Sequence, residues 1–198
     1  MTEAERDEEL VRRFRAGEPE AFTDLVRRHQ PRVYSVCLRV LGDADAAADV
    51  AQDTFLTVLR KLDGFRGDAA FTTWLHRVAV NACYDELRRK RRRPMLHVVA
   101  DDGAEHEPGA PAPDHADEVA GTRDVAAALA SIPEQFRMAL VLADVQDMAY
   151  EQISEVLDVP VGTVKSRVHR GRLALAAALG IDRGREPRGP AETSEQEP

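Results

Sequence analysis

The sequence predicts an all-α protein of two small helical domains joined by a flexible linker. Apolar residues recur at helical spacing from about residue 8 to 93 and again from about 119 to 179. No stretch shows the apolar–polar alternation of a β-strand over a useful length, and an acidic, proline-rich segment separates the two blocks. We therefore expect an N-terminal segment at 1–20, a first domain at 21–93, a linker at 94–118, a second domain at 119–180 and a disordered tail at 181–198.

The first domain is expected to contain three main helices. The segment PEAFTDLVRRHQPRVYSVCLRVLG contains Pro31, which should bend that helix or start a new one. Gly42 is a stop signal, and Asp43 is a cap candidate for the second helix. The third helix follows a loop flanked by glycines and ends in six basic residues, Arg88 to Arg93. The apolar positions at helical spacing are Phe22, Leu25, Val26, Val33, Val36, Cys37, Val40, Val50, Phe55, Val58, Leu59, Leu62, Phe71, Trp74, Leu75, Val78, Ala82 and Leu87.

The segment PMLHVVADDGAEHEPGAPAPDHADE predicts the linker. It holds four prolines and many carboxylates, so it cannot bury enough apolar surface to offset the entropy lost on ordering. Its proline and alanine content favours an extended tether.

The second domain ends in MAYEQISEVLDVPVGTVKSRVHRGRLALAAAL, which predicts a helix-turn-helix. Tyr150, Ile153, Val156 and Leu157 form the apolar face of a short helix, and DVPVG breaks it. Thr163 is expected to cap the second helix with its side-chain oxygen. On that helix the inward residues are Val164, Val168 and Leu175, and the outward or flanking residues are Lys165, Ser166, His169, Arg170 and Arg172.

Charge supports this interpretation. The chain has 27 Lys and Arg against 35 Asp and Glu, a formal net charge of −8, yet no carboxylate lies between Pro160 and Ile181. A phosphate surface explains the exclusion of acids from one helix, and the second helix of such a motif enters the DNA major groove. The alternative is an ordinary solvated basic face.

Enzyme and membrane classes find no support in the sequence. There is no nucleophile–base constellation, no glycine-rich phosphate loop and no Cys/His spacing for a metal. We expect no catalytic residues, cofactor, metal or small-molecule ligand. Cys37 and Cys83 are expected to be buried, reduced thiols, with a redox switch as the alternative. The start is polar and no apolar run approaches the ~20 residues that span a bilayer, so we expect a cytoplasmic protein without membrane insertion.

The segment YEQISEVLDVPVGTVKSRVHRGR resembles region 4 of bacterial sigma factors of the extracytoplasmic-function (ECF) group. DVAQDTFLTVLRKL resembles the polymerase-binding part of their region 2, and FRGDAAFTTWLHRVAVN resembles its promoter-opening part. The resemblance covers about residues 21 to 179 in the family's order, and the SigM-type factors of actinobacteria are the subgroup it suggests. Ser154 and Asp158 replace the family's usual alanine and glycine, and Asp tolerates the left-handed conformation better than most residues.

The resemblance implies a transcription initiation factor that binds core RNA polymerase and promoter DNA, and an anti-sigma factor as a controlling partner. The implied polymerase contacts are Asp49, Gln52, Asp53, Phe55 and Arg60. The implied contacts to the melted −10 element are Phe65, Arg66, Trp74, Arg77, Asn81, Arg88 and Arg89, with His76 of a suitable type. The implied contacts to the −35 element are Thr163, Lys165, Ser166, Arg167, His169, Arg170 and Arg172.

Several alternatives stay open from the residues alone. Phe71 and Trp74 also fit an apolar core, whereas Phe65, in the glycine-flanked loop, is the better candidate for touching DNA. The run Arg88 to Arg93 fits duplex phosphates and a solubilising surface equally well. A helix-turn-helix regulator that works without polymerase is the main rival function, but it leaves DVAQDTFLTVLRKL unexplained.

Overall fold

The structure is a computed structural model that describes residues 2–92 and 116–181 of the 198. Most of the predicted linker, at 94–115, and the predicted tail from residue 182 lie outside the described residues. Within the described ranges there are helices and turns but no strand, which confirms the all-α prediction. In chain order the helices are α1 (Glu3–Arg15), α2 (Pro19–Leu41), α3 (Ala44–Lys61), the 3-10 turn η1 (Leu62–Gly64), α4 (Phe71–Arg92), α5 (Ala116–Ser131), α6 (Glu134–Asp144), α7 (Tyr150–Leu157) and α8 (Val161–Ala178).

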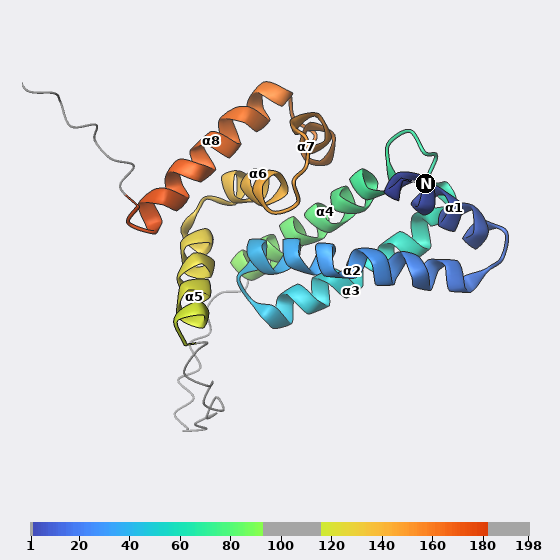
Figure 1. Ribbon diagram of the computed structural model, residues 1–198, viewed down its shortest axis with the longest axis horizontal. Helices are drawn as coiled ribbons and strands as arrows, with labels where there is room; N and C mark the ends of the chain where they lie inside the picture. Colours follow the sequence, from blue (N-terminus) through green and yellow to red (C-terminus); the bar gives the residue numbers. More distant parts are fainter. Residues whose placement is uncertain (1, 93–115, 182–198) are drawn as a thin grey trace, which may run out of the picture.

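Helices α1 to α4 form the first unit, in which α2, α3 and α4 lie alongside one another (Figure 1). Many of the apolar positions read from the sequence form the core. Leu25, Val33, Val36, Val40, Val58, Leu62, Phe71 and Leu75 are buried, whereas Phe22, Val26 and Val78 are only partly buried. Helix α2 continues through Pro31, so this residue does not start a new helix. Pro31 is exposed, which keeps its ring away from the core.

The boundary between α2 and α3 follows the predicted signals. Gly42 ends α2 in the left-handed conformation, with φ 68°, which costs a residue without Cβ little. Asp43 begins α3 as its N-cap, and its Oδ1 accepts hydrogen bonds from the backbone N–H groups of Asp45 and Ala46, both at 3.1 Å. Both predicted signals at this boundary are confirmed.

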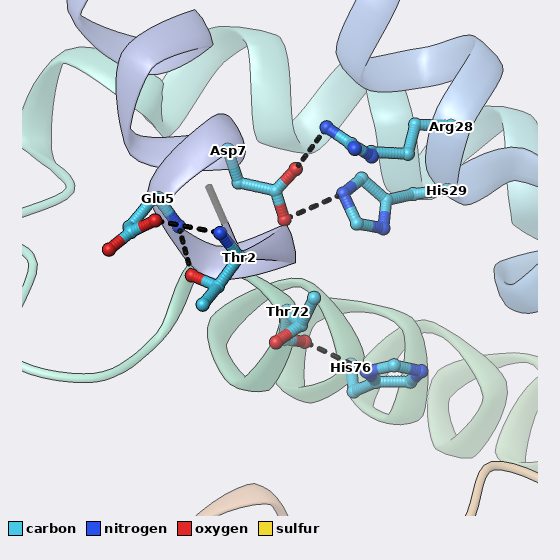
Figure 2. Close-up of polar contacts among 7 residues, drawn as sticks. All are labelled: Thr2, Glu5, Asp7, Arg28, His29, Thr72 and His76. Atoms are coloured by element: carbon cyan, nitrogen blue, oxygen red, sulfur yellow. Dashed lines mark hydrogen bonds and ion pairs between the residues drawn. The ribbon is translucent and has the colours of Figure 1, made fainter.

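Helix α1 has a clear structural start. The Thr2 hydroxyl oxygen accepts the Glu5 N–H at 3.2 Å, and the Glu5 carboxylate accepts the Thr2 N–H at 2.7 Å (Figure 2). This reciprocal capping box satisfies two donors that a helix leaves without partners. Val11 then buries its side chain against the first unit.

Helices α5 to α8 form the second unit, and they pack directly on the first. Helix α5 begins at Ala116, inside the range assigned to the linker. Helix α7 packs on α4, and α5 and α6 pack on α2 (Figure 1). The guanidinium of Arg77 on α4 donates to the backbone carbonyl of Glu155 on α7 at 2.7 Å. Buried apolar residues of both units therefore belong to one continuous core.

Candidate functional site

The predicted helix-turn-helix is present as α7, a short turn and α8. Ile153 and Val156 on α7 and Val164 and Val168 on α8 are buried, which fixes the two helices against the rest of the protein. Asp158 ends α7 in the left-handed conformation, with φ 52° and ψ 51°, as its place in a glycine position predicts.

Polar contacts in the turn differ in part from the prediction. The Ser154 hydroxyl donates to the backbone carbonyl of Val159 at 2.6 Å, which ties α7 to the turn. Thr163 is not the N-cap of α8, because the helix begins at Val161 and its N-cap is Pro160. The Pro160 carbonyl accepts from the N–H groups of Thr163 and Val164 at 2.8 and 3.1 Å. A proline before the first helical residue already has a φ compatible with helix entry, so Thr163 lies inside the first turn.

The outer face of α8 is basic and exposed. Lys165, Ser166, His169 and Arg170 are all exposed there, and the helix carries no carboxylate. The Ser166 hydroxyl donates to the Thr163 carbonyl at 3.0 Å. The Arg170 guanidinium lies 5.7 Å from the centre of the Phe136 ring, a cation–π contact that orients the side chain. Such a face can donate hydrogen bonds to base edges and phosphates.

Two arginines of the predicted −35 set have protein partners. Arg172 donates to both carboxylate oxygens of Asp144, at 2.6 and 3.0 Å, and this hydrogen-bonded contact raises the pKa of the guanidinium further. Arg167 is half-buried and lies near Tyr84 of α4, where burial raises the pKa of the phenol and the arginine charge opposes that rise. These two side chains therefore contribute to the packing around α8 as well as to its charge.

The predicted polymerase-binding helix is α3. Asp49, Gln52, Asp53 and Arg60 are exposed, whereas Phe55 is buried beneath them. The Arg60 side chain lies along its own helix, with Nε donating to the Leu56 carbonyl at 3.1 Å. The four predicted polar contacts are therefore accessible at the surface, and the predicted packing residue, Phe55, faces the core.

Sequence reasoning missed an apolar part of this face. Leu56 is 47% exposed and Leu59 is 40% exposed. Beside them an apolar groove between α2 and α3 is lined by Phe22, Val26, Tyr34, Ala48, Phe55 and Leu56, among others. Leu59 is one of the apolar positions at helical spacing in the sequence, but the structure leaves it partly exposed. The signal for Leu56 was available, because it lies next to Phe55 in sequence and so projects from a different side of the helix.

The predicted −10 residues come from one loop and one stripe of α4. Trp74, Arg77, Asn81 and Arg88 are spaced by three, four and seven residues, which places them on the same side of a helix. Arg66, Arg77, Asn81, Arg88 and Arg89 are exposed. Arg88 pairs with Asp85 at 2.8 Å, and Arg89 pairs with Glu86 at 2.7 Å.

Phe65 is placed differently from the expectation of a ring exposed on a loop. Its side chain is only 8% exposed. Its ring centre lies 5.1 Å from that of Trp74 and 5.9 Å from that of Phe71, the latter in an edge-to-face arrangement. A glycine-flanked loop predicts mobility of the backbone, but three aromatic rings bury more surface by packing together. Trp74 is half-buried, and Phe71 belongs to the core.

His76 is also unavailable to nucleic acid in this arrangement. It is buried where α4 meets the second unit, and its Nδ1 lies 2.8 Å from the Thr72 carbonyl (Figure 2). Burial lowers the pKa of the imidazole, with smaller opposing effects from Thr72 and from Gln146 of the second unit. A neutral His76 is therefore part of the contact between the two units.

Cys37 and Cys83 lie beside each other in the core, where α2 meets α4. Cys37 and Cys83 are buried, unbridged thiols whose sulfurs lie 3.8 Å apart. Contact with Cys37 and burial raise the pKa of the Cys83 thiol, which disfavours the reactive thiolate form. Among residues 2–92 and 116–181 no cluster of metal-ligating side chains occurs, and no helix there has the length and hydropathy to cross a membrane.

Comparison with known proteins identifies relatives across most of the chain. Residues 25–93 match the family Sigma-70 region 2, and residues 122–175 match Sigma-70, region 4. The chain is 38% identical over 192 residues to the RNA polymerase sigma-H factor of Pseudomonas aeruginosa, covering 90% of this chain and 96% of that protein. It is 37% identical over 182 residues to the ECF RNA polymerase sigma-E factor of Escherichia coli K12, covering 88% and 95%.

Two solved structures share the fold. CnrH, solved in complex with the cytosolic domain of CnrY, has a TM-score of 0.64 and 27% identity, and the match covers 89% of this chain and 99% of that chain. The sigma factor RpoE, solved with the anti-sigma factor NepR from Bartonella quintana, also has a TM-score of 0.64, with 24% identity and coverage of 82% and 98%.

Proposed function

Because this chain belongs to the sigma-70 family and to its ECF group, we propose that it binds core RNA polymerase and directs it to a specific set of promoters. The observation that carries the proposal is the presence, in one chain, of an exposed polar and apolar face on α3 and an acid-free basic face on α8. The first face suits a protein partner and the second suits DNA. The protein itself performs no bond chemistry, and its place of action is the cytoplasm, where RNA polymerase works.

Helix α3 is the proposed contact with polymerase. Its exposed residues Asp49, Gln52, Asp53 and Arg60 supply polar contacts, and the exposed Leu56 and Leu59 add apolar area that the sequence analysis did not assign. An apolar centre bordered by polar side chains is the usual composition of a specific protein interface. We propose that Phe55 supports this face from beneath.

The −10 element is proposed to meet the loop 64–70 and the outer stripe of α4. Unpaired bases bind on aromatic faces and beside cations, and this region contains Trp74, Phe65, Arg66 and Arg77. Because the Phe65 ring packs against Phe71 and Trp74, a stacking role for Phe65 requires the ring to leave that cluster. Arg66 on the loop needs no such movement, because it is already exposed.

The −35 element is proposed to bind the outer face of α8. Lys165, Ser166, His169 and Arg170 are the proposed base contacts, and Thr163, Arg167 and Arg172 are the proposed phosphate contacts. Lys and Arg pair with guanine edges in the major groove. Phosphate binding by Arg172 competes with its carboxylate partner Asp144.

The packing of the two units gives a physical reason why polymerase would be needed for promoter binding. Arg77 donates to Glu155 of α7, and the loop that carries Phe65 and Arg66 lines a depression that Glu155 also borders. We infer that α4 and α7 separate when the protein docks on polymerase, which frees Arg77 and opens the depression beside the loop. Because Arg77 contacts α7, single-stranded DNA can reach this side of Arg77 only after α7 has moved away.

Control by an anti-sigma factor is a further part of the proposal. CnrH, which is 27% identical to this chain, was solved in complex with the cytosolic domain of CnrY. A partner chain that binds α3 or holds the two units together would prevent polymerase binding without altering the protein covalently.

Reconstituted transcription tests the proposal. The purified protein is added to sigma-free core RNA polymerase and a library of promoter fragments, and the run-off transcripts are sequenced. Transcripts that share −35 and −10 elements upstream of their starts are the expected result. A variant carrying Lys165→Ala and Arg170→Ala should still bind core polymerase but lose these transcripts. Arg39→Ala removes one exposed positive charge from α2, where the side chain bonds Ser35, and should leave them unchanged.

The rival function makes a different prediction. A regulator that works without polymerase binds duplex DNA tightly by itself, with a strong dependence on salt. Absence of transcripts together with failure to co-migrate with core polymerase would reject the sigma-factor proposal in favour of this rival.

A further inference from the structure

The last residue of α1 contacts the end of the helix that precedes the proposed −10 loop. Nη2 of Arg15 lies 2.8 Å from the carbonyl oxygen of Leu62 and 3.2 Å from that of Asp63, and it also donates to the carbonyl of Phe65. These carbonyls lie in and just after η1, at the C-terminal end of α3. Carbonyls at a helix end have few intrahelical donors and carry partial negative charge, so a guanidinium is well suited to bind them.

Arg15 has a fixed position because α1 itself is anchored. The Asp7 side chain is completely buried, and its Oδ2 lies 3.0 Å from Nε2 of His29 on α2, which is 1% exposed (Figure 2). Its Oδ1 lies 3.4 Å from Nη1 of Arg28. The Phe14 ring lies 5.6 Å from that of Phe22 on α2. These contacts hold α1 against α2, although α1 precedes residue 25, where the match to Sigma-70 region 2 begins.

The carbonyl that Arg15 holds belongs to the residue that sets the start of the loop. Phe65 packs its ring against those of Phe71 and Trp74, and its neighbour Arg66 is exposed at the surface. Gly67 follows with φ +80°, a conformation that permits a sharp change of chain direction. The backbone at Phe65 therefore determines both where the aromatic ring packs and where the Arg66 guanidinium is presented.

We propose that Arg15 is a positioning residue for promoter opening: through the carbonyls of residues 62, 63 and 65 it holds the loop 64–70 in the geometry that reads the −10 element. It acts through the loop and not by touching DNA. By this proposal α1 belongs to the region that recognises the −10 element. The inference rests on the proposed function of that loop.

The test uses two variants and a matched control. Arg15→Ala removes all three contacts. Arg15→Lys keeps a positive charge and N–H donors, but its ammonium is carried on a shorter side chain than the Nη2 of Arg15 that makes the contacts. Arg12→Ala is the control, because Arg12 is an exposed arginine on the same helix whose partner is Glu9, one turn away. All three variants are expected to bind core polymerase with the affinity of the wild type.

The first readout needs no promoter. Trp74 is the single tryptophan, and its ring touches Phe65, so its emission reports the packing of the loop. Arg15→Ala should shift that emission to longer wavelength and increase its quenching by acrylamide, Arg15→Lys should show a smaller change, and Arg12→Ala should show none. Unchanged emission in Arg15→Ala would overturn the proposal, because the loop would then be held without Arg15.

The second readout is promoter opening by the reconstituted holoenzyme, followed with 2-aminopurine in the −10 element. Arg15→Ala should open the promoter about tenfold more slowly, the effect of losing a set of charged hydrogen bonds, and should discriminate less between −10 variants. Normal opening by Arg15→Ala, or an equal loss in Arg12→Ala, would overturn the proposal. If the wild type opens no promoter, the proposed function fails and this inference falls with it, whereas the emission change would still report the Arg15 contact.

Discussion

Replacing Asp7 by alanine should lower the free energy of unfolding by about 3 kcal/mol. The carboxylate is completely buried and faces two basic side chains, His29 at 3.0 Å and the partly buried Arg28 at 3.4 Å. Its removal takes away the carboxylate that faces the buried His29 imidazole, and leaving a buried polar group without its partner costs about 1–3 kcal/mol. The loss of the Arg28 contact adds a smaller amount, because that side chain is 24% exposed and can reach water.

The measurement is urea unfolding followed by circular dichroism, with thermal unfolding as a second probe. A loss of about 3 kcal/mol corresponds to a fall in Tm of roughly 6–12 °C for a chain of this size. Asp7→Asn keeps an acceptor and should cost less. Asp24→Ala is the control, since Asp24 is exposed and pairs with Arg27 one turn away at 3.7 Å, and it should change the free energy by less than about 0.5 kcal/mol. If Asp7→Ala is as mild as this control, the Asp7 contacts do not anchor α1.

Three further results are expected. Hydrogen bonds from Ala46 and Lys90 lower the pKa of Asp43, so its contribution to stability is complete above the ordinary pKa of about 3.9 and is lost as the pH falls below it. In Asp43→Ala the free energy of unfolding, measured with urea, should therefore fall less steeply as the pH is lowered. Holoenzyme binding to single-base variants of the −35 element tests two substitutions. Lys165→Ala should change the base preference by about 1–3 kcal/mol at one position. Arg167→Ala should weaken binding about equally for all sequences. Thiol reagents should react with Cys37 and Cys83 only as fast as the protein unfolds, because both are buried; faster modification of the native protein would favour the redox alternative.

Features that depend on local chemistry were predictable from the sequence. The end of α2 at Gly42 and the start of α3 at Asp43 follow from the conformational freedom of glycine and from a carboxylate beside free N–H groups. The helix-turn-helix follows from a breaker between two apolar stripes and from the absence of acids on one helix. The left-handed turn at Asp158 belongs to the same class of local signal.

Features that depend on distant neighbours were not predictable. Phe65 is in a loop, and its burial is decided by Phe71 and Trp74, whose positions the loop sequence does not specify. The anchoring of α1 depends on Asp7 meeting His29 on another helix. The contact between Arg77 and Glu155 joins residues 78 positions apart. Thr163 is a different case, because a local rule favoured it as a cap, whereas α8 begins two residues earlier at Val161, after Pro160, without a side-chain cap.

The comparison that tests the central claim most directly is the binding of one promoter fragment by the protein alone, by core polymerase alone and by the two together. The account predicts protection of the −35 and −10 elements only when both are present, because α7 lies beside the proposed −10 region in the free protein, where Arg77 is bonded to the Glu155 carbonyl. Protection of the same fragment by the protein alone, with no change when core polymerase is added, would contradict the account.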